Sequence, residues 1–308
     1  MLDSRVRIFL PFVLLTAILA ISASSVFIRF AQQEAPSLVI AALRLTCAAL
    51  LLAPLAWTRQ RHELQQLTRQ EITLGCLSGL FLAIHFATWT SSLEFTSVAS
   101  SVVFVSTGPL WVALLSPVLL HERLGLASVL GLLLAILGGV IIAISDTCTW
   151  DHGIQCPALN QVMQGRAMWG NFLALLGAWM VSGYLIIGRK LRAGGSVSLI
   201  PYIFFVYSLC ALALLVMMFA AGLSPLGYSA RTYGWIVLLA AFPQLIGHST
   251  YNWALRYIPA TLVAILTLIE PIGSAVLAYV VLGETPTYGV LVGGLLILTG
   301  VYFASKFG

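Results

Sequence analysis

The sequence predicts an all-helical integral membrane protein whose ten transmembrane helices form two inverted five-helix repeats. Three observations predict this fold class: an apolar composition, ten windows long enough to cross a bilayer, and an internal repeat. Of the 308 residues, 60% are hydrophobic and 8% are charged, whereas a soluble domain carries about 25% charged residues. This composition is typical of a chain that lies in a lipid bilayer.

A transmembrane helix needs about 20 mainly apolar residues. Such windows occur at 8–27, 38–57, 72–93, 98–120, 124–145, 168–188, 199–222, 233–255, 260–282 and 287–304. We therefore expect a first five-helix domain at 1–145, an external loop at 146–167 and a second domain at 168–308. Arg5 and Arg7 before the first window resemble the start of a cleavable secretory signal. We expect this helix to be retained, because the second half of the chain contains a helix that matches it.

Lysine and arginine are distributed unevenly between the loops. With the N-terminus inside, the cytoplasmic loops and ends hold eleven of the fifteen; Arg29, Arg166 and Arg231 fall on the other side, and Arg44 lies within a helix. The positive-inside rule then places both termini in the cytoplasm of a multi-pass protein of the plasma membrane. Because the membrane explains the basic excess, we expect no nucleic-acid partner.

The second half of the chain repeats the first. A shift of 162 residues without a gap superimposes four pairs of residues: Pro109 and Pro271, Glu122 and Glu284, Gly131 and Gly293, and Gly138 and Gly300. Each half has five helices, an odd number, so the second half enters the membrane upside down. Inverted repeats of this kind form the architecture of many secondary transporters.

The repeated residues form a recognisable motif. Each half has a proline in its fourth helix, then "L-x-E" or "L-G-E", then "G-x-x-L-x-x-x-G" at 131–138 and 293–300. Together with "EPIGSAVLAYVVLGE" and an arginine in the second helix, this pattern resembles two tandem EamA domains of the drug/metabolite transporter superfamily. The resemblance covers essentially the whole chain. It implies transport of small metabolites such as amino acids, through a central cavity lined by the first, third, fourth, sixth, eighth and ninth helices, with the fifth and tenth packed outside.

Features present in both halves are predicted to be structural. Pro109 and Pro271 each leave a carbonyl without its helical partner one turn earlier, which permits a bend. Glu122 and Glu284 are the glutamates of the repeated "L-x-E" and "L-G-E". Like the two prolines, they are assigned a structural role. The Gly75-x-x-x-Gly79 and Gly289-x-x-x-Gly293 motifs permit close helix packing, either inside a monomer or in a homodimer.

Glu270 is a feature of one half only, since its repeat partner is Gly108. No other charged residue lies between Ala260 and Gly283, and an ionisable group within a membrane indicates function. Thr267, Glu270 and Ser274 are spaced three and four residues apart and therefore form one polar stripe on a helix. We expect this stripe to line the cavity, with Glu270 binding a proton or a cationic group of the substrate. A buried ion pair is the alternative.

Polar and aromatic side chains of other helices complete the predicted substrate site. They are His85, Trp89, Ser101, Trp111, Trp179, His248, Tyr251 and Asn252. For the histidines, the alternative role is a structural hydrogen bond between helices. For the tryptophans, it is packing or anchoring at the membrane surface.

Arg44 is the one cation within a predicted span, and we assign it a structural role. It could pair with Glu270 or bind a substrate carboxylate. We favour a third interpretation, in which its long side chain snorkels to the outer surface.

Two of the five cysteines, Cys148 and Cys156, fall in the external loop. They form a candidate disulfide if that side is oxidising, and two free thiols are the alternative. With His152 between them they make only a weak metal signal, and we predict no metal.

The sequence lacks the signatures of the main competing functions. There is no G-x-x-x-x-G-K-[ST], no H-E-x-x-H and no G-x-S-x-G, so we expect neither ATP hydrolysis by a P-loop nor an enzyme, and no cofactor. The predicted function is secondary active transport by alternating access, exporting small polar or amphipathic metabolites, with Glu270 as the candidate for proton coupling. A facilitative carrier or exchanger of another organic solute, such as a drug, quaternary amine or nucleotide sugar, is the main alternative. An intramembrane enzyme is a weaker one.

The charge distribution makes the topology testable by cysteine labelling of intact cells. Single cysteines near Gln65 and Ala193 should be protected from a membrane-impermeant reagent, because both positions are predicted to be cytoplasmic. A cysteine near Gln161 should react. Reaction of the first two from outside would reverse the orientation.

Overall fold

The computed structural model describes residues 4–119, 125–145, 149–150, 154–155, 165–193 and 197–307. The helices of its first half are α1 (Ser4–Ser22), α2 (Ser24–Ala31), α3 (Ser37–Arg59), α4 (Arg61–Gln65), α5 (Arg69–Ser92), α6 (Val98–Val105), α7 (Gly108–Leu119) and α8 (Leu126–Ser145). Two short antiparallel strands follow, β1 (Thr149–Trp150) and β2 (Ile154–Gln155). The predicted disulfide partners Cys148 and Cys156 lie outside the described residues.

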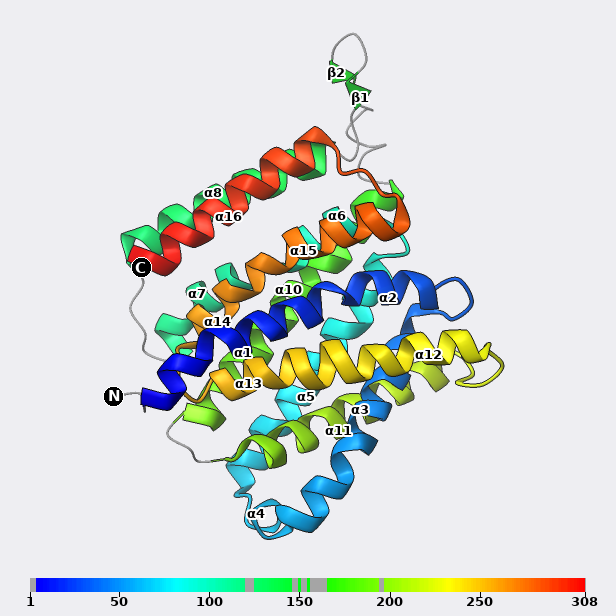
Figure 1. Cartoon of the computed structure of the whole chain (residues 1–308), viewed down its shortest axis with the longest axis vertical. Helices are drawn as coiled ribbons and strands as arrows, with labels where there is room; N and C mark the ends of the chain where they lie inside the picture. The colour runs from blue at the N-terminus through cyan, green and yellow to red at the C-terminus, as the bar shows by residue number, and fades with distance from the viewer. Residues whose placement is uncertain are drawn as a thin grey trace.

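The second half begins with α10 (Arg166–Arg192) and α11 (Leu199–Ala220). A continuous run then contains α12 (Ala230–Leu239), the π-helical segment η2 (Ala240–His248) and α13 (Ser249–Ala254). The next run contains α14 (Ala260–Leu266), the 3₁₀ turn η3 (Thr267–Ile269), α15 (Glu270–Leu277) and the π-helical segment η4 (Ala278–Leu282), and α16 (Tyr288–Phe307) is the last helix. Apart from the strand pair, the described chain is helical, as predicted (Figure 1).

Six helical segments are long and apolar enough to cross a membrane: 12–31, 37–59, 69–92, 98–115, 166–192 and 199–220. Large apolar side chains are exposed on the outside of the bundle; Phe12, Leu50 and Val118 are 68%, 66% and 73% exposed. Extensive exposed apolar surface marks contact with a membrane or a partner, and here it surrounds helices of membrane-spanning length. The chain is therefore a multi-pass membrane protein. The count of ten spans and the inversion of the halves stay predictions.

Several helical runs are interrupted in the middle. Helix α6 ends at Val105, and α14 gives way to the 3₁₀ turn at Thr267. The proline four residues after each position, Pro109 or Pro271, has no N–H to donate to that carbonyl. These two interruptions lie where the sequence predicts bends at the prolines. A third, at Ala23 between α1 and α2, has no proline beside it.

Helices α8 and α16 pack side by side at one edge of the bundle (Figure 1). Their contact depends on glycine, because a Cβ atom on Gly138 would clash with the carbonyl oxygen of Gly293. Gly75 and Gly79 of α5 similarly face side chains of α11. These glycine motifs therefore pack helices of one chain together, and the choice between monomer and homodimer stays open.

Four glutamates outside the central bundle bind the first turns of other helices. Each accepts a hydrogen bond from a backbone N–H that has no partner within its own helix. The pairs are Glu34 with Ser229, Glu63 with Ser198, Glu94 with Ser37, and Glu284 with Val98. These contacts fix the loops against the ends of distant helices.

Glu284 also pairs with Arg29 at 3.2 Å, the single ion pair within the described part of the chain. Arg29 donates at 3.0 Å to the carbonyl oxygen of Thr96. At a shift of 160 residues, Ser182–Arg189 of the second half corresponds to Ser22–Arg29. Arg189 donates at 2.7 Å to the carbonyl oxygen of Leu255. Glu284 therefore holds Arg29 of α2 and the start of α6 together, and its assignment to the scaffold stays a prediction. Its repeat partner Glu122 lies outside the described residues.

Helix α1 begins and α16 ends on the same side of the bundle, at the left of Figure 1. This placement agrees with two termini on one side of the membrane. That this side is the cytoplasmic one stays a prediction.

The close approach of α8 and α16 predicts different tolerances at two glycines. Gly138→Val should lower the melting temperature of the purified protein, because overpacking a tight contact costs about 1–3 kcal/mol. Gly294→Val is the matched control on the same helix pair, since a Cβ there has no atom within 4 Å. Equal melting temperatures for the two variants would contradict the packing.

Candidate functional site

A cavity of about 50 Å³ lies in the middle of the bundle. Its wall contains residues of α1, α5, the α6–α7 interruption, α10, η2 with α13, and α14 with α15. These are the first, third, fourth, sixth, eighth and ninth predicted spans, the set that the family resemblance implies, and α8 and α16 contribute no residue. This space is large enough for a few water molecules only, so a metabolite would need the surrounding helices to move.

Six of the predicted substrate-site residues line the cavity. They are His85, Trp89, His248, Tyr251, Thr267 and Glu270. They come from three separate stretches of the chain, which only the folded bundle brings together.

Glu270 supplies the carboxylate of the cavity. It is the first residue of α15 and is followed by Pro271. A helix start suits both residues, since the N-terminal end of a helix favours negative charge and a proline there gives up no hydrogen bond. The side chain is 8% exposed, and none of the described residues forms an ion pair with it. A carboxylate in this position has to take up a proton or a cation, because an isolated buried charge is very unfavourable.

His85 and Trp89 form one wall. Their rings stack with centroids 5.8 Å apart. The Nδ1 atom of His85 lies 2.9 Å from the carbonyl oxygen of Gly177 on α10, so this nitrogen carries a proton that it donates, and Nε2 is left as the second ring nitrogen. His85 thus makes a structural hydrogen bond between helices and lines the cavity as well. Phe86 connects this wall to His248, with ring centroids 5.3 Å apart.

Three polar atoms of the cavity wall have no hydrogen-bond partner among the described residues: Trp89 Nε1, Ser106 Oγ and the Tyr251 hydroxyl. Leaving a buried polar group unpaired costs about 1–3 kcal/mol. Their presence around one cavity with a carboxylate indicates a site for a polar ligand. Ser106 was not predicted from the sequence. Its repeat partner is Leu268, so this position is polar in one half only. The comparison of halves that singled out Glu270 would also have found this serine.

The other five predicted residues do not line the cavity. Ser101 forms a hydrogen bond with Ser92. The rings of Trp111 and Trp179 lie edge to face, with centroids 5.0 Å apart. Asn252 donates to Tyr184 and to the His248 carbonyl, and Ser274 donates to the Ser22 carbonyl. In this conformation each of them has a partner within the protein. Contact between these residues and a substrate stays a prediction.

The prediction that Arg44 snorkels to the surface is wrong, because this residue is only 1% exposed. Its Nη1 atom donates to Ser24 Oγ at 3.2 Å, and its guanidinium carbon lies 4.3 Å from the centre of the Phe86 ring. Helices α2, α5 and α11 all pack against α3. They enclose the side chain and leave it no path to water.

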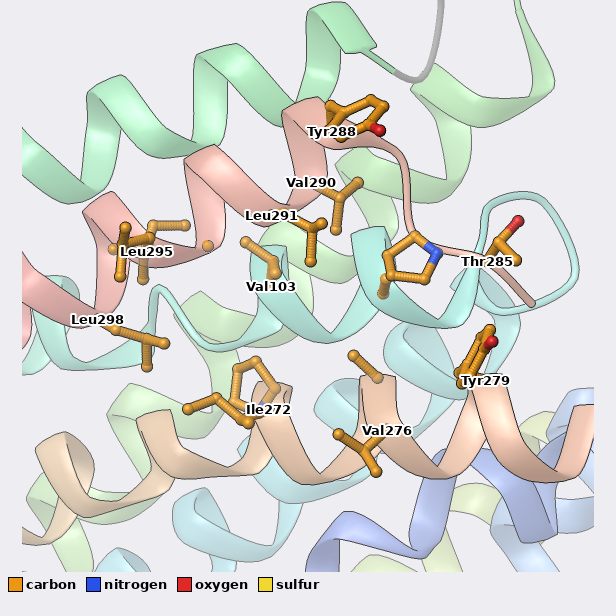
Figure 2. A pocket seen from close by; sticks show the side chains of 16 residues that line it. Val103, Ile272, Val276, Tyr279, Thr285, Tyr288, Val290, Leu291, Leu295 and Leu298 are labelled. Atoms are coloured by element: carbon orange, nitrogen blue, oxygen red, sulfur yellow. The ribbon is translucent and has the colours of Figure 1, made fainter. Parts of the chain in front are cut away.

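A larger cavity, of about 690 Å³, lies between α15 with η4 on one side and α16 on the other (Figure 2). Apolar side chains line it, including Ile272, Val276, Leu291 and Leu295. Its wall includes none of the predicted substrate-site residues and no charged group. We therefore place the candidate site in the smaller, central cavity, where the polar groups are.

Comparisons with known proteins agree with this architecture. A model of the EamA-like transporter family matches residues 9–144 and 168–306. Two uncharacterized transporters of Archaeoglobus fulgidus are 21% and 25% identical over 92% and 78% of this chain, and the matches cover 92% and 79% of those proteins. The uncharacterized transporter YetK of Bacillus subtilis is 23% identical over 94% of this chain and 85% of its own length. One crystal structure shares the fold, with a TM-score of 0.70 at 20% identity over 96% of this chain and 95% of the other.

Two neighbouring residues of α13 are predicted to differ in role. Tyr251→Phe removes an unpartnered hydroxyl from the cavity wall, so it should weaken substrate binding and leave the melting temperature nearly unchanged. Asn252→Ala removes a side chain that donates to Tyr184 and to the His248 carbonyl. It should lower the free energy of unfolding by about 1–3 kcal/mol, and the melting temperature with it. The reverse pattern would place the site elsewhere.

Proposed function

Because the chain belongs to the EamA-like transporter family, it is a membrane transporter, and we propose that it works by alternating access as a secondary transporter of small polar or amphipathic metabolites such as amino acids. The observation that carries the proposal is the small central cavity, which holds the buried carboxylate of Glu270 beside three unpartnered polar atoms. An ionisable group at such a place is typical of a solute or proton pathway. We propose export as the direction of transport because the family that the chain resembles includes exporters.

Two inverted halves with five spans each would give this chain its two alternating openings. The family model matches the chain twice, and the interruptions at Val105 and Thr267 are separated by the repeat length. Discontinuous helices at the meeting point of two halves are a common feature of transporter binding sites. The two conformations would then differ by exchange of the bends between the halves.

The ion pair of Arg29 with Glu284 is suited to close one end of the pathway. It joins the end of α2, the loop after η4 and the start of α6. The two side chains are 27% and 30% exposed, and an ion pair near the surface contributes only about 0–1 kcal/mol. Such a contact can open without a large change in free energy. Arg189 occupies the corresponding place in the second half.

Glu270 would bind a proton or a cationic substrate group in one conformation and release it in the other. Its neighbours support this role. The Thr267 hydroxyl donates to the Ala264 carbonyl at 2.6 Å, and Thr267 lines the cavity together with Glu270. Together the two residues form a small region that favours cations in a mostly apolar wall.

A facilitative carrier without proton coupling would use the same cavity. Purified protein in proteoliposomes distinguishes the two mechanisms through a screen of labelled metabolites, with and without an imposed pH gradient. Accumulation of a solute above its external concentration, driven by the gradient, supports coupled transport. Equilibration alone indicates a carrier, and uptake no faster than in empty liposomes would contradict transport of the tested solutes.

The central variant is Glu270→Gln, which keeps the shape of the side chain and removes its charge. It should abolish the pH dependence of transport, or its preference for cationic solutes, while expression and folding stay near normal. Glu284→Gln is the matched control, because this glutamate lies outside the central cavity. It should reduce stability or assembly more than solute selectivity.

An unchanged rate and pH profile in Glu270→Gln would make this carboxylate structural. A variant that does not fold would show that the fold itself depends on this carboxylate.

A further inference from the structure

We propose that Arg44 is a second substrate-binding residue, which takes a carboxylate of the transported molecule while Glu270 takes its cationic group. The inference rests on the proposed function and narrows the substrate to molecules that carry both an amine and a carboxylate. Four observations lead to it.

The first observation is that Arg44 is a buried cation without an anion. Its Nε and Nη2 atoms have no hydrogen-bond partner among the described residues, and its single hydrogen bond goes to the neutral hydroxyl of Ser24. The contact with the Phe86 ring is favourable for a cation, but a ring does not accept the remaining N–H groups. Buried charges in proteins are normally paired and fully hydrogen-bonded.

The second observation is a comparison with Arg192, which is also 1% exposed. Arg192 donates to the carbonyl oxygens of Asn252 at 3.2 Å and Val197 at 2.6 Å. A buried arginine with a structural role in this protein is therefore satisfied by backbone carbonyls. Arg44 has no such partners, which separates it from the scaffold to which the sequence alone assigned it.

The third observation is that the two unpaired charges lie on either side of one helix interruption. Ser24, at the start of α2, accepts the hydrogen bond from Arg44. Ser22, at the end of α1, accepts one through its carbonyl from Ser274, one turn beyond Glu270 on α15. The hydroxyls of Ser22 and Ser25 are buried and unpartnered. Movement of α2 relative to α1 at this point would open a polar path between Arg44 and the cavity.

The fourth observation is that Arg44 lies just behind the wall of the cavity that holds Glu270 and yet forms no ion pair with it. Its guanidinium lies against the Phe86 ring, and the same ring contacts His248, which lines the cavity with Glu270. A simple amine would neutralise only Glu270, and a simple carboxylate only Arg44. A molecule with both groups neutralises the two together. The planar guanidinium is suited to this task, because it binds a carboxylate through two parallel hydrogen bonds.

The test measures binding to the purified full chain in detergent, by thermal shift and competition. Each common amino acid is tried, and the one that stabilises the protein most is compared with two derivatives, the amine that lacks its carboxylate and the acid that lacks its amine. The wild type should prefer the amino acid to each derivative by about tenfold or more, as expected for the loss of one charged hydrogen bond.

Arg44→Gln should bind the amino acid and the amine about equally, while still rejecting the acid. Glu270→Gln should show the opposite pattern. Arg192→Gln is the matched control, since it also removes a buried guanidinium; it should lower the melting temperature and keep the wild-type preference for the amino acid. If Arg44→Gln does not fold, Arg44→Lys keeps the charge, and it should keep the order of preference with weaker binding.

Three results would overturn the inference: an unchanged preference in Arg44→Gln, equal binding of amino acid and amine by Arg44→Lys, or stabilisation by none of the amino acids. Its failure is distinguishable from failure of the proposed function. Transport of a singly charged solute in proteoliposomes would preserve the transporter and remove the role of Arg44. Absence of transport for every solute would contradict the proposed function itself.

Discussion

The buried carboxylate of Glu270 is the constraint on which the rest of the central site depends. Transfer of an ionised group from water into a low-dielectric interior costs several kcal/mol even after the protein relaxes. The surrounding structure reduces this cost only in part: a helix begins at the residue, and polar atoms of Trp89, Ser106 and Tyr251 lie around the same cavity. The rest of this cost has to be offset by a proton or a bound cation. In the proposed function, this proton or cation is the one that is transported.

Some features of the chain are shared by both halves, and others occur in one half only. Proline interruptions and close glycine contacts occur in both halves, and they shape the helices without adding charge to the centre. Glu270 and Arg44 occur in one half only, and both are buried in the bundle. In the proposed mechanism, the scaffold exchanges conformations between the two halves, and the asymmetric residues would give the pathway its selectivity.

Much of the fold could be predicted because its causes are local in sequence. Apolar windows follow from composition, and the bends at Pro109 and Pro271 follow from the missing N–H group. Six of the predicted substrate-site residues line the cavity because helical periodicity placed polar side chains on one face. The burial of Arg44 could not be predicted, since it depends on the packing of α2, α5 and α11 around α3. For the same reason the partners of Ser101 and Asn252, and the interruption at Ala23, appear only in the folded structure.

The most direct test of the central claim is the reactivity of the Glu270 carboxyl itself. A hydrophobic carbodiimide modifies carboxyl groups in apolar surroundings, and peptide mass spectrometry identifies the modified residue. If Glu270 faces the transport pathway, the reagent should label it, and a bound cationic or zwitterionic solute should slow that labelling without affecting a glutamate of the loops such as Glu63. Labelling of Glu270 at the same rate with and without every solute that the protein transports would contradict a site at this carboxylate.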